Sequence, residues 1–380
     1  MELLEALIRI VVGLAGVALV ARTMLAALRS LLLPRGANDR VSRFLFLVVR
    51  RTFGWVAGPE RPYAFRDRIL AYYGPVSLLL VLIFWLFLVM LGYALIYWAI
   101  GVGSDPARVT DVSPIVEALR LSGSSLLTLG FAAPSVPGTT FLVFSEATLG
   151  LILVAMLIAY LPTIYGAFSR RELLVNLLEV RADSPPSAVV MLTRFQRLHG
   201  LDSLHAMWEQ WEPWFSELEE THTSLPILVF YRSQQANHSW VNAAGAIMDT
   251  AALARSVVDM PLDVQADLTI RAGYLAVRRI ADYFNVAYDH SPRQDDPTSI
   301  SRAQFEAACA VLEAAGVPLK VDRNRAWLDF NGWRVNYDAP LRALERIALA
   351  PPSWWERPMA SAYVTDEPVV GGAGTGAAEA

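Results

Sequence analysis

The chain has 380 residues, of which 54% are hydrophobic and only 18% are charged, and its formal net charge is -4. Ordinary soluble domains carry about 25% charged residues, so this composition indicates a protein that keeps much of its apolar surface in lipid. The single cysteine, Cys309, excludes an intrachain disulfide framework and is expected to be a small buried hydrophobe. The near balance of 32 basic and 36 acidic residues argues against a nucleic-acid partner.

Three apolar segments predict membrane helices. Residues 5–32 form the first, and its arginines are expected to snorkel to the interface. Glu2 and Glu5 do not fit the positively charged start of a cleavable signal peptide. The second is the uncharged run Val76–Ile100 and the third is Ala147–Ser169, each with the approximately 20 apolar residues that a crossing requires.

Arginine distribution predicts the orientation. Residues 34–70, between the first two helices, contain eight arginines and three acids, whereas residues 100–113 contain only Arg108. The positive-inside rule therefore places residues 34–70 and the chain after Arg171 in the cytoplasm, with the N-terminus outside. We expect a multi-pass protein of a bacterial inner membrane, with a cytoplasmic C-terminal domain.

The arginine-rich stretch predicts an amphipathic helix. At about 100° per residue, an arc of about 100° holds Arg40, Arg43, Arg50 and Arg51, and Phe44, Leu45, Val48 and Val49 lie outside it. Such a helix either lies flat on the inner leaflet, with membrane lipid as its partner, or packs against the protein itself.

Residues 113–145 predict a half-helix followed by irregular backbone. Ser113 and Pro114 are a helix start, and Pro134 and Pro137 interrupt any continuous membrane helix. A further crossing would also place Arg171 outside. Non-helical backbone at membrane depth is tolerated only where protein buries it or water lines it, so the segment implies a cavity.

The segment from about residue 70 to residue 172 resembles the potassium-channel superfamily, in its bacterial form with two pore-forming helices around a re-entrant loop. The resemblance implies an outer helix, a pore helix at Ser113–Leu127, a filter and an inner helix at Thr139–Ser169. The filter residues would be Thr128, Leu129, Gly130, Phe131 and Ala132, where the family reads Thr-x-Gly-Tyr-Gly. The chain departs from that pattern at Phe131, Ala132 and Ala133.

In such a filter, backbone carbonyls and the Thr128 hydroxyl would replace the water around a cation. An alanine in place of a glycine with positive φ is strained by ~1 kcal/mol or more, so we expect distortion at Ala132. The resemblance implies passive conduction of a monovalent cation, with potassium the expected ion, through a homotetramer. It implies no cofactor and no metal other than the permeant cation.

Four residues of the third membrane helix are candidates for roles in the pore. Glu146 either braces the filter from behind, binds a cation near the mouth, or reaches outward to water. Gly150 and Gly166 are either hinges or sites of close helix packing, and Pro162 is a candidate kink.

The fold class expected is a membrane all-α protein with four regions. Residues 1–70 hold the N-terminal helix and the amphipathic helix, 71–171 the pore, 172–365 a mostly helical cytoplasmic regulatory domain and 366–380 a disordered tail. Within the third region, residues 187–286 and Ile300–Ala315 predict helices, and the alternation around Asn331-Gly332 in residues 326–337 predicts a small β-hairpin.

The cytoplasmic half shows no enzyme signature. Trp208, Trp211 and Trp214 are expected in a core or subunit interface rather than on a ligand-stacking face. A metal site is the weaker interpretation of four other side chains, since their spacing matches no standard ligand pattern: Glu217, Glu220, His222 and His238. The sequence identifies no cytoplasmic ligand.

We therefore expect a regulated cation channel and not an enzyme. Two alternatives remain open from the residues alone. One is a non-conducting membrane sensor or scaffold that keeps the pore architecture, which the departures at Ala132 and Ala133 favour. The other is a membrane-anchored enzyme whose chemistry lies in residues 187–365.

Overall fold

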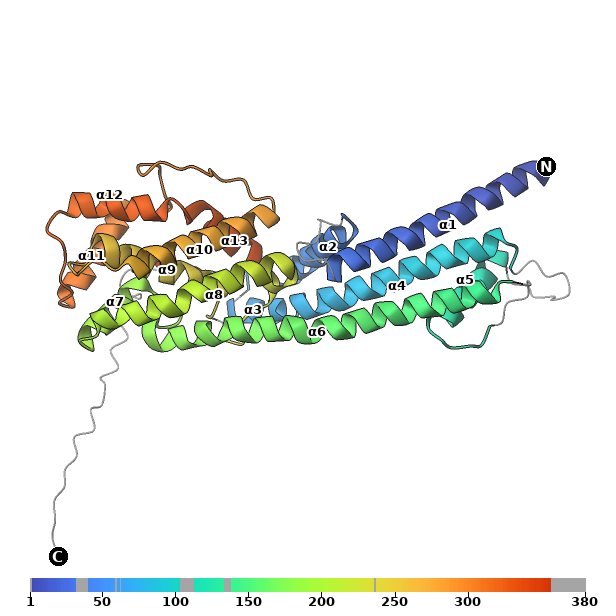
Figure 1. Ribbon diagram of the computed structural model, residues 1–380, viewed down its shortest axis with the longest axis horizontal. Coiled ribbons are helices and arrows are strands. Elements are labelled where there is room, and N and C mark those ends of the chain that lie inside the picture. The colour runs from blue at the N-terminus through green and yellow to red at the C-terminus, as the bar shows by residue number, and fades with distance from the viewer. Residues whose placement is uncertain are drawn as a thin grey trace, which may run out of the picture. The chain divides into compact units, whose positions relative to one another are not determined.

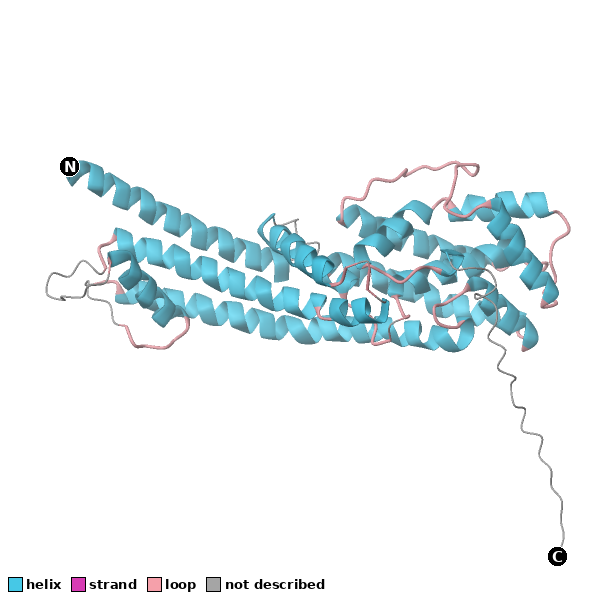
Figure 2. Cartoon of the chain, turned by 180° about the vertical axis from the view of Figure 1, so that it is seen from behind, coloured by secondary structure: helices cyan, strands magenta, loops and turns pink. Residues whose placement is uncertain are grey.

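The computed structural model describes residues 2–31, 40–58, 60–61, 63–102, 113–132, 138–235 and 237–356. In these ranges the regular elements are helices, and no strand is present (Figure 2). The α-helices are α1 (Glu2–Leu31), α2 (Arg40–Val56), α3 (Tyr63–Ala71), α4 (Tyr73–Ala99), α5 (Pro114–Leu126), α6 (Thr140–Ala182), α7 (Ala188–Arg197), α8 (Leu204–Ser224), α9 (Trp240–Ser256), α10 (Val264–Tyr283), α11 (Arg302–Ala314), α12 (Arg323–Arg334) and α13 (Asp338–Ala348). Short 3-10 turns are η1 (Leu201–Ser203), η2 (Pro226–Phe230) and η3 (Trp354–Glu356).

The chain divides into two compact units whose segments interleave in sequence. The first contains residues 1–174, 216–236 and 279–285, and the second contains the remainder. The predicted boundary at residue 172 lies close to the first division, inside α6. The return of residues 216–236 and 279–285 to the first unit was not predicted.

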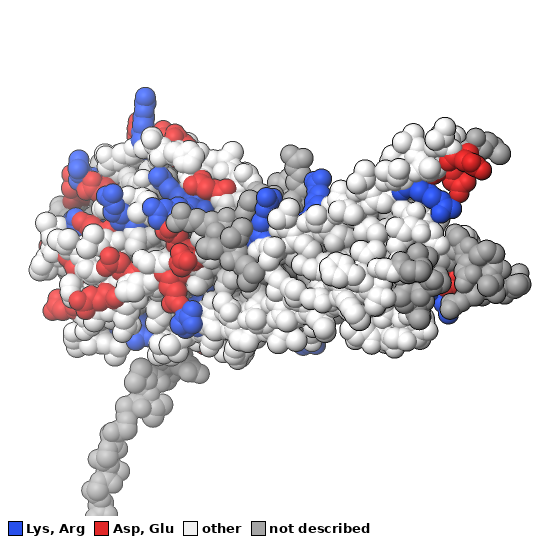
Figure 3. All heavy atoms as spheres, turned by 45° about the vertical axis from the view of Figure 1, so that its right-hand side comes forward, with Lys and Arg blue, Asp and Glu red and all other residues white. Residues whose placement is uncertain are grey.

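The first unit contains three helices long and apolar enough to cross a membrane, within Glu2–Ser30, Phe65–Ala99 and Thr140–Ala182. In Figure 3 these helices present an almost uncoloured surface, and charged side chains appear near the N-terminus and around α2. The 43 residues of α6 extend about 65 Å at 1.5 Å per residue, roughly twice the hydrocarbon thickness. The helix therefore continues well beyond the bilayer.

Small residues allow α1 to pack closely along α4, and Figure 1 shows the two helices side by side. A Cβ atom added at Gly16 would lie 2.6 Å from the carbonyl oxygen of Gly92, and one added at Gly92 would lie 2.6 Å from a methyl of Val20. Lipid tails are as apolar as the helices, so the hydrophobic effect does not drive membrane helices together. Van der Waals contact between closely packed backbones instead stabilises their association. The helix predicted at residues 5–32 is thus α1, and it belongs to the first unit.

In the second unit, α9 is the central helix. Sixteen of its residues are buried, and α7, α12 and α13 pack against it. Its sequence is rich in alanine, which lets neighbours approach closely. Trp208, Trp211 and Trp214 on α8 are also buried, with Trp211 and Trp214 ring centroids 4.7 Å apart, which agrees with the expected core role.

The predicted β-hairpin at residues 326–337 is wrong, because this segment forms most of α12 and its end. The Asp322 side chain caps the helix by accepting from the Arg325 N–H at 2.9 Å. Ala326 and Phe330, four residues apart, are buried on one helical face. Asn331 does not form a turn and instead donates its side-chain amide to the carbonyl of Gln294 at 2.8 Å.

Other predicted helices are present. The helix expected at Ile300–Ala315 is α11, which begins with a capping box between Ser301 and Gln304. The half-helix expected at Ser113–Leu127 is α5, with Ser113 as its N-cap and Pro114 as its first residue. The predicted disordered tail, residues 366–380, lies outside the described residues.

Candidate functional site

The candidate site is the tract that follows α5. This helix has 13 residues and a length of about 20 Å, too short to cross about 30 Å of hydrocarbon. After it, the Thr128 N–H donates to the Ser125 carbonyl at 3.0 Å and the Leu129 N–H to the Ser124 carbonyl at 2.8 Å. This pair of bonds is a Schellman motif, which satisfies the last carbonyls of the helix.

The Schellman motif here contains an unusual residue. Its left-handed position is normally glycine, but the chain places Thr128 there with φ of +57°. Gly130, two residues later, has φ of +69°, whereas Leu129 between them is not left-handed. A β-branched residue in this conformation costs ~1–2 kcal/mol, and backbone strain of this kind concentrates at functional sites.

The tract then turns back along α5. The Ala132 N–H donates to the side-chain oxygen of Ser124 at 3.1 Å. This bond holds the far end of the tract against the helix that precedes it. Ala132 itself does not have positive φ, so the strain expected at this residue is instead at Thr128.

Large apolar side chains of the tract are exposed in the single chain. Leu127 is 55% exposed, Leu129 61% and Phe131 60%. Thr128 and Gly130 are exposed as well. Ala133, the second departure from the family pattern, lies outside the described residues.

Glu146 of α6 is completely buried behind α5. Its carboxylate accepts a hydrogen bond from the Tyr97 hydroxyl of α4 at 2.9 Å and another from the Ser122 hydroxyl of α5. Ser122 Oγ also lies 2.8 Å from the carbonyl oxygen of Met90. The carboxylate thus joins three helices, and its burial leaves no path for it to reach outward to water.

A second polar contact lies beside this network. The hydroxyl of Tyr93 on α4 is 2.8 Å from the hydroxyl of Ser145 on α6. Sequence reasoning identified Glu146 but missed its partners. The signal was the serine-rich run Ser122–Ser125, because polar side chains that pack among apolar helices need hydrogen-bond partners inside the protein.

Gly150 allows α6 to touch the end of α5. A Cβ atom at this position would lie 2.7 Å from the carbonyl oxygen of Leu126 and 2.9 Å from one of its methyl groups. Gly150 therefore acts as a packing glycine beside the tract. Pro162 and Gly166 lie about 18 and 24 Å further along the helix at 1.5 Å per residue, so the structure does not bring them to the same site.

The first unit has another buried polar cluster, around Arg171 near the C-terminal end of α6. Its guanidinium donates to the carbonyls of Leu228 at 2.8 Å and Tyr231 at 2.7 Å, and to Glu172. It also lies 3.1 Å from Nε2 of His222. Burial, together with the charge of Arg171, lowers the pKa of His222 well below its usual value. The imidazole is therefore neutral, with Nδ1 donating to the Leu218 carbonyl and Nε2 accepting from Arg171.

The contacts of this cluster do not form the metal site considered for His222. Its two ring nitrogens are already engaged, and Glu217 instead forms an ion pair with Arg170. His238 belongs to the second unit, where its Nδ1 is 2.9 Å from Asn176. Among the described residues, no group of three His, Cys, Asp or Glu side chains is arranged to hold a metal ion.

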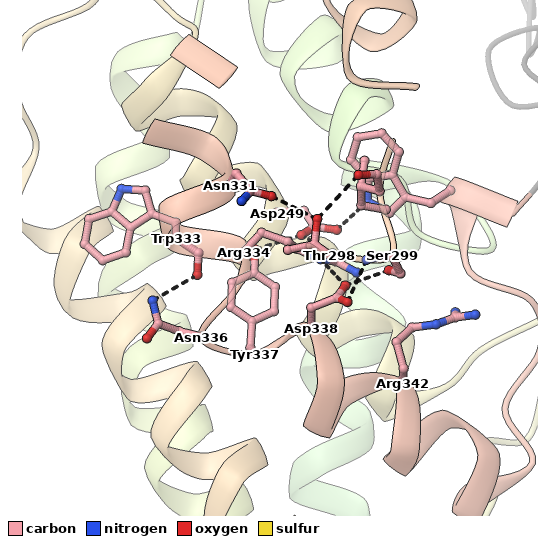
Figure 4. A network of polar contacts seen from close by, with 12 residues as sticks. Asp249, Thr298, Ser299, Asn331, Trp333, Arg334, Asn336, Tyr337, Asp338 and Arg342 are labelled. Carbon is pink, nitrogen blue, oxygen red and sulfur yellow. Dashed lines mark hydrogen bonds and ion pairs between the residues drawn. The ribbon is translucent and has the colours of Figure 1, made fainter. Parts of the chain in front are cut away.

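The second unit contains a buried ionic network, shown in Figure 4. Asp249 of α9 accepts from Arg334, from the Tyr337 hydroxyl at 2.8 Å and from the Trp355 indole at 2.8 Å. Arg334 also donates to Asp338 at 2.8 Å. The network joins α9, α12, α13 and the C-terminal turn η3, and its groups satisfy one another, so we assign it a structural role.

Comparisons with known proteins support the conclusion that this chain is a membrane protein. No family model matches the chain, and no solved structure matches it. The chain is 24% identical over 259 residues to an uncharacterized membrane protein, YdjJ of Bacillus subtilis (strain 168). The match covers 66% of this chain and 71% of that protein. With its three apolar helices, the chain is a membrane protein of mostly helical structure.

Proposed function

We propose that this chain is one subunit of a cation channel whose copies meet at residues 128–132. The observation that carries the proposal is the backbone of this tract. Left-handed residues at Thr128 and Gly130 alternate with a residue that is not left-handed, and such alternation turns successive carbonyl groups toward the same side of the chain. Carbonyl oxygens aligned in this way can replace the water around a cation.

The position of the tract supports the same function. It follows a helix too short to span the bilayer and turns back along that helix. Irregular backbone at this depth requires protein or water around it. The negative end of the α5 dipole also points toward the start of the tract, which favours a cation there.

A single copy supplies only one wall of such a pore. The exposed side chains of Leu127, Leu129 and Phe131 are apolar and flank the carbonyl groups, so contact with other copies would cover them. A homotetramer would close the carbonyl ring around one axis. Potassium is the proposed permeant ion, and the second unit is the proposed cytoplasmic regulator of a pore in a bacterial inner membrane.

Of the three roles considered for Glu146, we assign it the one in which it braces the filter. It acts on the tract through Ser122, because Ser124 two residues later holds Ala132 in place. In this role its carboxylate fixes α5 against α4 and α6 and does not itself bind the permeant ion.

The proposal is tested by cation flux from liposomes that contain the purified chain under a potassium gradient. We expect a leak from the wild type, an altered ion selectivity in Thr128→Ala and a reduced or lost flux in Gly130→Ala. An added Cβ at Gly130 meets no atom within 4 Å, so its effect comes from the positive φ alone, at about 1 kcal/mol. The fold should therefore survive.

Two matched variants serve as controls. Thr128→Ser keeps the hydroxyl and should keep the selectivity. Thr148→Ala removes an exposed α6 hydroxyl that donates to the Phe144 carbonyl of the same helix at 2.8 Å, and should leave flux unchanged. Intact oligomers that pass no cation would instead favour the sensor or scaffold alternative. Unchanged conductance and selectivity in both Thr128→Ala and Gly130→Ala would refute the assignment of the tract.

A further inference from the structure

Helix α2 packs against other helices of the first unit along one face and leaves a second apolar face uncovered. Val49 is buried, and the Phe53 ring contacts the Tyr73 ring of α4 edge-on, with centroids 5.7 Å apart. At about 100° per residue, Val48 and Trp55 lie within about 20° of each other on a different side of the helix. Trp55 is 86% exposed and Val48 is 42% exposed.

The depth of this face follows from its contact with α4. Tyr73 is the first residue of α4. The 27 residues of α4 extend about 40 Å, which is the thickness of a bilayer with its headgroups. The contact between Phe53 and Tyr73 therefore places α2 at the level where the apolar span ends. Tryptophan is enriched at this level because its ring is apolar and its N–H is polar.

The charges around this face are those that a leaflet of anionic lipid would attract. Residues 48–71 contain five arginines and two acids, and one of the acids, Asp67, is ion-paired with Arg232 at 2.5 Å. Arg51 lies about 60° around the helix from Val48, and Arg51 and Arg68 are both exposed. Each arginine near such a surface contributes about 1 kcal/mol of attraction.

We propose that this face of α2 binds the anionic phospholipid leaflet, with Trp55 and Val48 inserted at the headgroup boundary and Arg51 and Arg68 on the lipid phosphates. A second copy of the chain would also cover apolar side chains, but two copies would bring together more arginines than Glu60, the remaining acid of residues 48–71, can pair. The partner is therefore lipid. The proposal concerns a surface away from residues 128–132 and does not depend on conduction.

The insertion is tested with a nitroxide label at residue 55. Cys309 is the only cysteine in the sequence, so a Cys309→Ala background permits single labels at Trp55→Cys, Val48→Cys and Val321→Cys. In vesicles of phosphatidylglycerol and phosphatidylcholine, labels at 55 and 48 should be reached by oxygen and protected from a water-soluble nickel chelate. A label at Val321, which is 98% exposed in the second unit, should show the reverse.

The charge component is tested by the preference of the protein for spin-labelled phosphatidylglycerol over spin-labelled phosphatidylcholine. We expect Arg51→Gln to lower this preference by up to about fivefold, the equivalent of about 1 kcal/mol, and Arg68→Gln to act similarly. Arg271→Gln, at an exposed position on α10, is the matched control and should change nothing.

Three results would overturn the proposal. The first is access of the nickel chelate to residue 55 equal to its access to residue 321. The second is spin–spin broadening at residue 55, which would show that a second copy covers the face. The third is a lipid preference that does not respond to either arginine substitution.

Discussion

Substitution of Gly150 by alanine tests how closely α6 controls the end of α5. The new Cβ would lie 2.7 Å from the carbonyl oxygen of Leu126, and backbone atoms cannot move aside as a flexible side chain can. Ordinary contact begins near 3.4 Å, so the end of α5 must shift by several tenths of an ångström. Leu126 is the last residue of α5, two positions before Thr128, so the shift reaches the tract.

The stability cost of Gly150→Ala is isolated by comparison with Gly166→Ala in the same helix. There the nearest atom to an added Cβ is the side-chain nitrogen Nη1 of Arg170 at 3.5 Å, which is an ordinary distance. Both substitutions gain a similar helix propensity, about 1 kcal/mol. The difference between the two variants therefore isolates the overpacking, which costs about 1–3 kcal/mol.

The assay compares the thermal unfolding of both variants in one detergent, with cation flux measured on the same preparations. Gly150→Ala should unfold at a lower temperature than Gly166→Ala and should alter flux, whereas Gly166→Ala should match or exceed the wild type in stability. Equal unfolding temperatures for the two variants would refute the close contact between Gly150 and Leu126.

Two further predictions concern the second unit. Asp249→Ala leaves the buried guanidinium of Arg334 without its main partner, so we expect a loss of about 3–5 kcal/mol in unfolding free energy. The measurement is a denaturant titration against an Asp329→Ala control, which removes only the solvent-accessible ion pair with Arg325 on the same helix. Burial raises the pKa of Glu345 to about 7 against the opposing effect of Arg342, so the folded state binds the extra proton. Stability should fall as pH rises from about 4.5 to 7, by at most about 1.4 kcal/mol per pH unit, and a Glu345→Gln variant that retained this slope would contradict the assignment.

Much of the fold was predictable from local pattern. Long apolar runs identify the membrane helices because about 20 apolar residues are needed to cross the bilayer, and α1, α4 and α6 follow those predictions. The proline at the start of α5 and the serine ahead of α11 marked those helix starts. The alternation around Asn331 led to the wrong prediction of a β-hairpin. A short alternation of apolar and polar residues also fits a helix whose buried residues lie four apart.

The candidate site was predictable only in part. Thr128 and Gly130 were selected through the resemblance to a channel filter, whereas Glu146 was selected because an ionisable residue inside a membrane helix is costly and therefore a functional candidate. Their partners were not, because Tyr97, Ser122 and Glu146 lie on three different helices and meet only when these pack. The backbone strain expected at Ala132 is at Thr128, where a helix end and not a sequence motif sets the dihedral angle.

The sequence by itself determined that this protein enters a membrane, where its helices cross, and that a short helix and irregular backbone lie between two of them. These follow from hydropathy and from the chemistry of proline and glycine, which act within a few residues. Only the tertiary structure decided that Glu146 is fully buried, that Gly150 touches the end of α5 and that residues 216–236 return to the first unit. Those features depend on contacts between residues far apart in the chain, and no local pattern encodes them.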